Sequence, residues 1–493
     1  MITVRWRLAL CTALLTASTA RSAAAQDMPA IVPLHPAVVT HHEGVFNGKK
    51  VLYTATVSET IVRDAAGKPA ARIVSTAYTA DGADAASRPV LFACNGGPIG
   101  PSSPLHMLAL GPRRVAIPDD LSAAPSTFRL VDNSYAVLDV ADVVFFDPAS
   151  TGWSRVLDGV KPDVYYTTDD DAQQFASFID RWLRENHRMA SPKYVLGESY
   201  ATIRAPETAR QLLHLPQPIV LDGVFLMGQA TNQLEINTRP YNILAPVVGL
   251  PSVAATAWYH QKIDRRGRTV RQVMAEAAQF ANGEYLTALF KGNAALDEPA
   301  RKGIADRLAS FTGIPASYFL ANNLRITRPT FQMELFKQEG LKLGSDDARY
   351  AGPVRGPEPG AVLPAAAYAA LLRYFRDELH VDRSDEYRQR QFAPSGPGDP
   401  WAYAATGSPF SDFPYTASIT EVMLRNPAFR VVVGSGIYDM KTTTGAAEYL
   451  VAQSGWPASR VRISYYEGGH MAYSNESALK HFGDDVRALV SGR

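Results

Sequence analysis

Apolar and polar residues alternate with the two-residue period of β-strands in the early part of the chain. The alternation runs over Val51–Val57 and again over Ala71–Tyr78, with the turn-forming residues Asp64–Gly67 between them. We predict an antiparallel hairpin at one edge of a sheet. Two denser apolar runs follow, at Pro89–Ala93 and Val140–Phe146. Continuous apolar runs are typical of strands that helices cover on both faces.

Helical patterns alternate with these strands. Asp169–Asp171 are predicted to cap a helix, and its apolar residues between 175 and 183 fall on one face as core residues. Further buried strands are predicted at Lys193–Leu196 and Ile219–Met227. Strands that alternate with helices indicate an α/β fold, with a mostly parallel central sheet flanked by helices.

The pattern changes at about residue 235 to amphipathic helices separated by proline and glycine, and strand patterns resume at Arg430–Gly434 and Arg460–Ser464. We predict a core in two parts, residues 26–234 and 396–493. Residues 235–395 are then a helical insertion, whose aromatic side chains form mainly a small core of their own. An insertion at this point of an α/β fold is expected to form a lid over the site.

The first 25 residues predict a signal peptide. Two arginines precede the apolar run Leu8–Leu15, and the small residues Ala23–Ala25 precede Gln26. This is the pattern of a cleavable signal peptide, so we predict export and a periplasmic or secreted protein. Lipid anchoring at Cys11 is a weaker alternative, because the residue before it is Leu10 rather than a small one.

Composition excludes several classes of protein. The chain has 493 residues, of which 46% are apolar and 20% charged, so it can bury a large core. Removing residues 1–25 takes away three arginines and no acid, which leaves a nearly neutral chain and indicates neither a nucleic-acid partner nor an anionic membrane surface. Only Cys94 then remains, so an intramolecular disulfide is impossible. No later stretch has 18 uninterrupted apolar residues, so we expect a soluble protein without membrane anchoring.

One stretch, Lys193–Ala201, combines a short apolar strand with a glycine break and a serine before a helix. This is typical of a nucleophile elbow, which needs small residues two positions before and after the serine. Gly197 and Ala201 fill those positions around Ser199. A serine that caps an ordinary helix gives the same local pattern, so the assignment depends on partners elsewhere in the chain.

Those partners are an acid and a base. A serine hydroxyl is a poor nucleophile unless a base lies within hydrogen-bond reach and an acid orients that base. Among ten histidines, His470 lies in a Gly-Gly-His turn after a predicted strand, and Asp439 follows the strand Arg430–Gly434. Either residue alone could be an ordinary loop residue. Together, the order Ser199, Asp439, His470 is that of the α/β-hydrolases, and we predict these three as catalytic.

The sequence also resembles the serine carboxypeptidase family. The resemblance rests on four islands, Asn95–Pro98, Val144–Pro148, Gly197–Tyr200 and Gly469–Met471, and on the helical insertion between the serine and the acid. It implies an α/β-hydrolase fold and an enzyme that removes the C-terminal residue of a peptide substrate, with no cofactor and no metal.

The resemblance also implies residue roles. The nucleophile is Ser199, the orienting acid Asp439 and the base His470, while the backbone N–H groups of Gly97 and Tyr200 form the oxyanion hole. An early glycine loop and the residue after the nucleophile are where an elbow can aim two donors at a tetrahedral oxygen.

The sequence matches the substrate-binding residues of the serine carboxypeptidase family only in part. The resemblance implies that Asn95, Gly96 and Glu198 bind the substrate, Asn95 and Glu198 through its terminal carboxylate. Where the family usually has a tryptophan this chain has Ala93, and where the family usually has a second glutamate it has Ala109. Ile99 also stands where the family usually has a glycine. Three arginines are candidates to bind the substrate carboxylate through a guanidinium group instead, although each is better explained as a structural or surface residue. These are Arg113, Arg114 and Arg204.

We therefore predict an exported serine-type carboxypeptidase that acts through an acyl-enzyme. The alternative is an esterase or acyltransferase that uses the same three catalytic residues on another acyl donor. A binding protein without catalysis is a third hypothesis, and the complete set Ser199, Asp439 and His470 argues against it.

Overall fold

The structure is a computed structural model that describes residues 34–118, 124–231, 240–389, 401–403 and 415–492. The predicted signal peptide and the predicted domain boundaries near 235 and 395 lie outside these residues. All helices and strands of the described residues belong to the compact unit that begins at His35.

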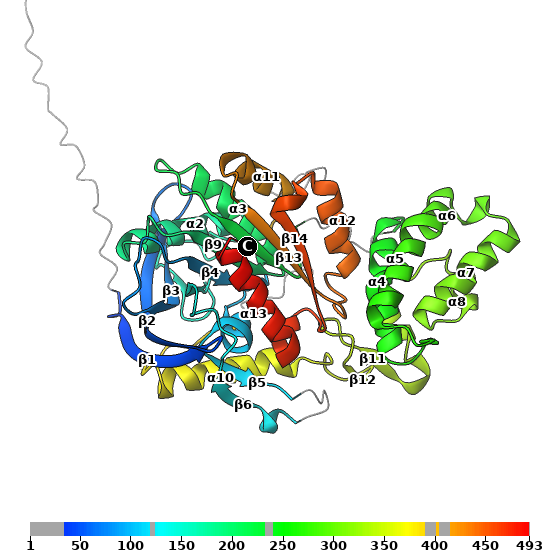
Figure 1. Ribbon diagram of the computed structural model, residues 1–493, viewed down its shortest axis with the longest axis horizontal. Coiled ribbons are helices and arrows are strands. Elements are labelled where there is room, and N and C mark those ends of the chain that lie inside the picture. Colours follow the sequence, from blue (N-terminus) through cyan, green and yellow to red (C-terminus); the bar gives the residue numbers. More distant parts are fainter. Residues whose placement is uncertain (1–33, 119–123, 232–239, 390–400, 404–414, 493) are drawn as a thin grey trace, which may run out of the picture. The chain divides into compact units, whose positions relative to one another are not determined.

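A large, mostly parallel sheet forms the centre of this unit (Figure 1). In spatial order the strands are β1 (Val38–Phe46), β2 (Lys49–Arg63), β3 (Pro69–Ala80), β7 (Asp142–Phe146), β4 (Val90–Cys94), β9 (Lys193–Glu198), β10 (Gly223–Met227), β13 (Arg430–Gly436) and β14 (Val461–Tyr466), with β8 (Arg155–Val156) beside β3. The pairs β1/β2, β2/β3 and β3/β7 are antiparallel, and from β7 onward neighbouring strands run parallel.

The predicted hairpin is present as β2 and β3, with Val57 opposite Thr76, but it does not form the edge of the sheet. The edge strand is β1, which the sequence analysis did not predict. Its side chains are half-buried or exposed up to the last residue, and it includes His41, His42 and Glu43, so it has no apolar alternation. Polar residues on an edge strand are expected, because they discourage pairing with another chain.

Helices cover both faces of the sheet, as predicted. On β4, Val90 and Phe92 join one apolar cluster and Leu91 joins the other. The first cluster includes side chains of α2 (Thr168–Glu185), α3 (Ala201–Leu213), α11 (Tyr415–Arg425) and α12 (Thr444–Ser454). The second includes side chains of α10 (Val362–Asp377) and α13 (Glu476–Val490).

The apolar face predicted at 175–183 is buried in α2. The cap of this helix differs from the prediction. Thr167, not an aspartate, is the N-cap, and its hydroxyl accepts a 3.0 Å hydrogen bond from the Asp170 N–H. Asp169–Asp171 occupy the first turn instead, where acidic side chains interact favourably with the helix dipole.

The insertion contains helices that pack on one another, with a further apolar cluster between them (Figure 1). Tyr285, Phe319 and Phe331 lie in this cluster, as predicted, whereas Phe290 is 82% exposed. Helix α10 lies within the predicted insertion, but its apolar side chains pack in the core beside the sheet. The helices of the insertion are α4 (Leu244–Tyr259), α5 (Val270–Phe280), α6 (Leu286–Lys291), α7 (Glu298–Thr312), α8 (Ala316–Ala321) and α9 (Arg328–Glu334).

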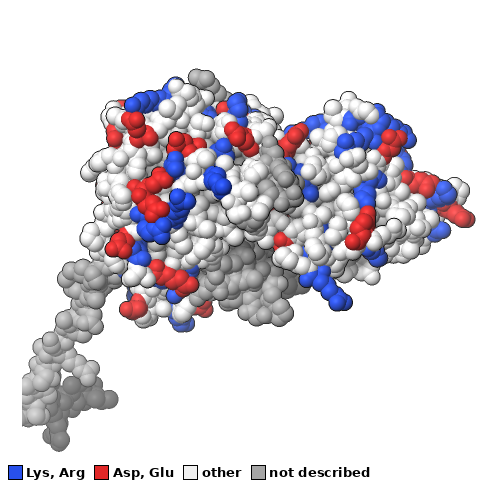
Figure 2. All heavy atoms as spheres, turned by 90° about the horizontal axis from the view of Figure 1, so that it is seen from below, with Lys and Arg blue, Asp and Glu red and all other residues white. Residues whose placement is uncertain are grey.

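Short elements complete the unit. They are α1 (Ser103–Leu105), β5 (Arg113–Ala116) paired with β6 (Arg129–Asp132), and β11 (Leu341–Leu343) paired with β12 (Ala351–Pro353). Basic and acidic side chains are interspersed on the face shown in Figure 2. Over the described residues, no helix combines the length and the apolar character needed to cross a membrane.

Candidate active site

Ser199 lies at a sharp turn between β9 and α3. Its φ angle is +59°, a left-handed conformation that is strained for a residue with a side chain. A Cβ on Gly197 would lie 2.2 Å from the carbonyl oxygen of Ala201, so only glycine allows the strand and the helix to approach this closely. The Ser199 N–H donates a 2.8 Å hydrogen bond to the Met227 carbonyl at the end of β10. This is the local geometry of a nucleophile elbow.

Asp439 and His470 form a buried hydrogen-bonded pair. Asp439 follows β13 and is fully buried, and its Oδ2 accepts a 2.7 Å bond from the Nδ1–H of His470. Burial raises the pKa of Asp439, but the charge of His470 and hydrogen bonds hold it below its ordinary value overall. Burial lowers the pKa of His470, and Asp439 outweighs this effect and raises it to about 9. Because Nδ1 holds its proton toward Asp439, neutral His470 has its free lone pair on Nε2, where a base needs it.

Thr442 also belongs to this pair, although the sequence analysis did not identify it. Its hydroxyl donates to Oδ2 of Asp439 and lies 3.2 Å from Nδ1 of His470, and its N–H donates a 3.0 Å bond to Oδ1 of Asp439. The Lys441 N–H donates to the same oxygen at 2.6 Å. An aspartate that accepts from N–H groups two and three residues later is a common loop turn, so spacing alone gave a weak signal for Thr442.

The end of β10 brings the nucleophile and the base together. Ser199 bonds to Met227 there, and a Cβ on the next residue, Gly228, would lie 3.0 Å from Cε1 of His470. The three predicted catalytic residues therefore gather at the carboxyl edge of the sheet, because β9, β10, β13 and β14 run parallel.

The loop after β4 lies directly against the elbow. A Cβ on Gly96 would be 2.5 Å from the backbone nitrogen of Tyr200 and 3.0 Å from Cβ of Ser199. Gly97 has a φ of +131°, which favours glycine. Among acceptors in the described ranges, neither the Gly97 N–H nor the Tyr200 N–H has a hydrogen-bond partner. Two unused donors beside the serine, one of them at the N-terminus of α3, can stabilise a developing oxyanion.

Glu198, Asn95 and Tyr473 form a buried polar cluster beside Ser199. Oε1 of Glu198 accepts a 3.0 Å bond from Nδ2 of Asn95, and Oε2 accepts from the Tyr473 hydroxyl. Burial raises the pKa of Glu198 to about 7, while the charge of His470 and the two hydrogen bonds act in the opposite direction. The carboxyl group can therefore change its protonation state near neutral pH. Sequence reasoning did not identify Tyr473, whose only signal is its position three residues after His470.

The three arginines that could have replaced a carboxylate ligand all pair with acids of this chain. Arg204 is fully buried, 2.7 Å from Asp171, and it donates a 2.9 Å bond to the carbonyl of Asn95. Arg204 therefore holds the backbone of the loop after β4 and is already paired with an acid, so it is a structural residue. The other two form ion pairs with side chains from β6, from the residue that follows α10, and from α13. These pairs are Arg113 with Asp132 and Glu378, and Arg114 with Glu476.

A segment of the insertion, Ser345–Ala348, contacts both the loop that carries Asp439, here called the acid loop, and the loop that carries His470, here called the base loop. We call this segment the crossing segment. The N–H of Met440 donates to the carbonyl of Ser345 at 3.2 Å, and the N–H of Ala348 donates to that of Tyr438 at 3.0 Å. The N–H of His470 donates to the carbonyl of Asp346 at 2.5 Å. The loops that carry Asp439 and His470 are therefore both bonded to the same short piece of backbone.

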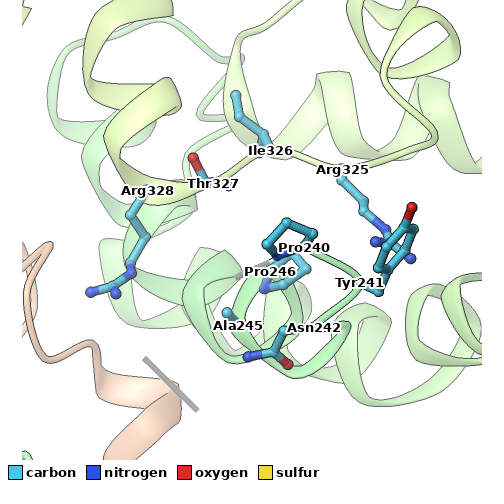
Figure 3. Close-up of a pocket in the computed structure, with 9 residues that line it drawn as sticks. All are labelled: Pro240, Tyr241, Asn242, Ala245, Pro246, Arg325, Ile326, Thr327 and Arg328. Atoms are coloured by element: carbon cyan, nitrogen blue, oxygen red, sulfur yellow. The ribbon is translucent and has the colours of Figure 1, made fainter. Parts of the chain in front are cut away.

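Arg328, at the start of α9, is a second link from the insertion to the acid loop. Its guanidinium group donates to the carbonyls of Met440 and Lys441. The residue also lines a cavity of about 110 Å³ in the insertion, and Figure 3 shows its side chain directed away from the other lining residues. Those residues are Pro240, Tyr241, Asn242, Ala245, Pro246, Arg325, Ile326 and Thr327.

The sheet order, the elbow serine and an acid–base pair on the loops after β13 and β14 define the α/β-hydrolase fold. Within that fold, residues 77–285 match the serine carboxypeptidase family, which confirms the resemblance seen in the motifs and supports a serine hydrolase. The matched region contains Asn95, Glu198 and Ser199, while Asp439 and His470 lie beyond it.

One solved structure supports this fold, and a second shows only a similarity. A prohormone-processing carboxypeptidase from Saccharomyces cerevisiae, Kex1(Δ)p, superposes with a TM-score of 0.52 and 13% sequence identity over 90% of each chain. A proline iminopeptidase from Mycobacterium smegmatis gives a TM-score of 0.39 and 13% identity over 88% of this chain and 98% of its own. A search of curated proteins gave no match to this chain.

Proposed function

We propose that the protein is an exported serine-type carboxypeptidase, which releases the C-terminal residue of a peptide through an acyl-enzyme on Ser199. The observation that carries this proposal is the buried cluster of Glu198, Asn95 and Tyr473 next to the nucleophile. A buried carboxyl that can be protonated near neutral pH is suited to bind the free carboxylate that distinguishes the end of a peptide from its interior.

The proposed reaction uses these groups in turn. Nε2 of His470 takes the proton of the Ser199 hydroxyl as Oγ attacks the carbonyl carbon of the last peptide bond. The N–H groups of Gly97 and Tyr200 stabilise the oxyanion. His470 then gives the proton to the leaving amine, which departs as a free amino acid and leaves an ester on Ser199. Water hydrolyses this ester by the same proton transfers, and Asp439 remains ionised throughout.

Export is a separate part of the proposal. It is supported by the pattern of residues 1–25, with the cleavage site expected before Gln26. N-terminal sequencing of the protein recovered from the periplasm or medium tests it. A mature chain that starts at Met1 and stays with the cytoplasm would disprove export without affecting the enzymatic proposal.

The enzymatic proposal is tested first with a fluorophosphonate probe, which labels only an activated serine. We expect wild type to be labelled and Ser199→Ala to be unlabelled. Turnover of Ser199→Ala should fall by several orders of magnitude, roughly the 10⁶-fold loss seen when such a nucleophile is removed, with an unchanged circular dichroism spectrum. Substantial activity in a folded Ser199→Ala protein would contradict the assignment.

A peptide library digested by the enzyme and read by mass spectrometry then tests the type of hydrolase. A carboxypeptidase shortens free peptides by one residue at a time from the C-terminus and leaves the same peptides with amidated ends much less affected. The second candidate, an esterase or acyltransferase, is favoured by Ala109, which lacks the usual glutamate. It predicts rapid turnover of esters and no shortening of free peptides.

A further inference from the structure

Tyr473 donates its hydroxyl to Glu198 from the loop that carries the base. It lies in a short turn, Ala472–Ser474, that begins two residues after His470, and its side chain is 1% exposed. The Leu105 N–H donates to Oδ1 of Asn95 at 3.1 Å, which fixes Nδ2 of that amide toward Glu198. Both oxygens of Glu198 therefore face donors, one from the loop after β4 and one from the base loop.

The position of Tyr473 is related to the missing glutamate. The turn Ala472–Ser474 packs against the turn His106–Leu110, which carries Ala109, and Ala109 and Tyr473 lie in the same apolar cluster. Ala109 has only a methyl group where the serine carboxypeptidase pattern has a second carboxyl group. Besides Asn95, Glu198 in this chain has a second polar partner, Tyr473, which comes from the base loop instead.

We propose that Tyr473 is a specificity-determining residue that donates a hydrogen bond to the terminal carboxylate of the substrate while protonated Glu198 supports it from behind by donating to the Tyr473 oxygen. This inference rests on the proposed carboxypeptidase function. In the empty site the Tyr473 hydroxyl donates to Glu198. When a carboxylate binds, Glu198 takes up one proton from solvent and donates it in a hydrogen bond to the Tyr473 oxygen. The phenol hydrogen then turns to the substrate carboxylate, and the proton returns to solvent when the product leaves.

The charged groups around this pair decide which member titrates. Burial and the nearby Glu198 raise the pKa of the Tyr473 phenol well above its ordinary value, so it keeps its proton. The charge of His470 favours ionised Glu198, and the charge of Asp346 opposes it. Asp346 itself is paired with Lys441. The pH dependence of carboxylate binding therefore comes from Glu198, and Tyr473 acts as the donor.

The test compares Tyr473→Phe with Tyr466→Phe. Tyr466 is also buried and also donates its hydroxyl to a carboxylate, that of Asp485, so its variant loses the same kind of bond at an acid other than Glu198. Kinetic constants are measured over a range of pH for one peptide with a free terminus and for its amide. For Tyr473→Phe we expect KM for the free peptide to rise roughly ten- to hundredfold, the value of one hydrogen bond to a charged group.

Two further results are expected for Tyr473→Phe. Its kcat/KM for the amide should stay unchanged, because the amide has no carboxylate to bind. The decline of free-peptide hydrolysis at alkaline pH should move to higher pH, because ionised Glu198 has lost a donor. Tyr466→Phe should match wild type in every measurement, and equal fluorophosphonate labelling shows that Ser199 is intact in both variants.

A measurement on wild type keeps the inference testable if Tyr473→Phe does not fold. Calorimetry with an N-acylated amino acid, in buffers of different ionisation enthalpy, should show uptake of one proton per bound ligand at a pH where Glu198 is ionised, and no uptake with the corresponding amide. Absence of proton uptake would overturn the inference. A folded Tyr473→Phe variant that keeps the wild-type preference for free termini would also overturn the inference, and the proposed function would then still stand. Equal rates for the free peptide and its amide in wild type would instead overturn the proposed function.

Discussion

An alanine at position 469 tests whether the crossing segment fixes the position of the base. Gly469 precedes His470 and lies against this segment. A Cβ added there would be 2.2 Å from the carbonyl oxygen of Asp346 and 2.3 Å from Cβ of Asp347, whereas ordinary contacts begin at 3.4 Å. Both neighbours are held by backbone, so neither can rotate away. The base loop must therefore move by about 1 Å relative to the insertion.

A shift of this size has a calculable effect on catalysis. Misplacing a catalytic group by about 1 Å costs on the order of 10²-fold in rate, which corresponds to about 2.7 kcal/mol in activation free energy. Overpacking should also lower the free energy of unfolding by about 1–3 kcal/mol. We thus expect Gly469→Ala to fold, with a lower Tm, and to lose about two orders of magnitude in kcat.

The assay uses an ester substrate, because ester hydrolysis needs the three catalytic residues but no terminal carboxylate. Gly303→Ala is the matched control. Gly303 lies inside α7, where an added Cβ has no atom within 4 Å, so its variant should keep wild-type kcat and gain roughly 1 kcal/mol of stability from helix propensity. Wild-type kcat in folded Gly469→Ala would refute the claim that the crossing segment holds the base in place.

Two further predictions concern Glu198 and the insertion core. Burial raises the pKa of Glu198 to about 7, and only its protonated form tolerates a substrate carboxylate beside it, so kcat/KM for a free peptide should fall relative to that for an ester as pH rises through about 7. Glu198→Gln should flatten that relative fall. Ester hydrolysis should increase with pH up to about 9, the pKa that Asp439 gives His470, because only neutral His470 can act as the base; coincident pH profiles for peptide and ester would contradict the role of Glu198. Phe331 is fully buried in the insertion, so Phe331→Ala should lower the free energy of unfolding by about 3–5 kcal/mol in a denaturant titration, and an unchanged midpoint would show that this core does not stabilise the fold.

The strands of the sheet were predictable from sequence to the extent that burial shaped them. Runs such as Pro89–Ala93 are apolar throughout because helices cover both faces, and the structure confirms the α/β fold that they indicated. Strand β1 was missed because an edge strand needs no apolar alternation. Helix α10 was assigned to the insertion because sequence position does not show which core an amphipathic helix joins.

Some residues of the candidate site could be predicted from sequence and others could not. Ser199, Asp439 and His470 follow strands, so chain order alone places them at one edge of a parallel sheet; their catalytic roles remain predictions. Tyr473 and the crossing segment could not be predicted, because their contacts join residues far apart in sequence. The Tyr473 hydroxyl reaches Glu198 across 275 positions, and no local periodicity records such a contact.

The crossing segment also sets a limit for engineers who would exchange the insertion to change specificity. Helices α6 to α8, residues 286–321, pack against other elements of the insertion, so a graft there would replace side chains of the insertion core but none of the bonds to the two catalytic loops. Arg328 and the crossing segment are bonded to the loops that carry the acid and the base, so a graft that removes them would alter the reaction along with the selectivity. The junction for a modular exchange therefore lies before residue 328, well inside the boundary that the sequence pattern indicates.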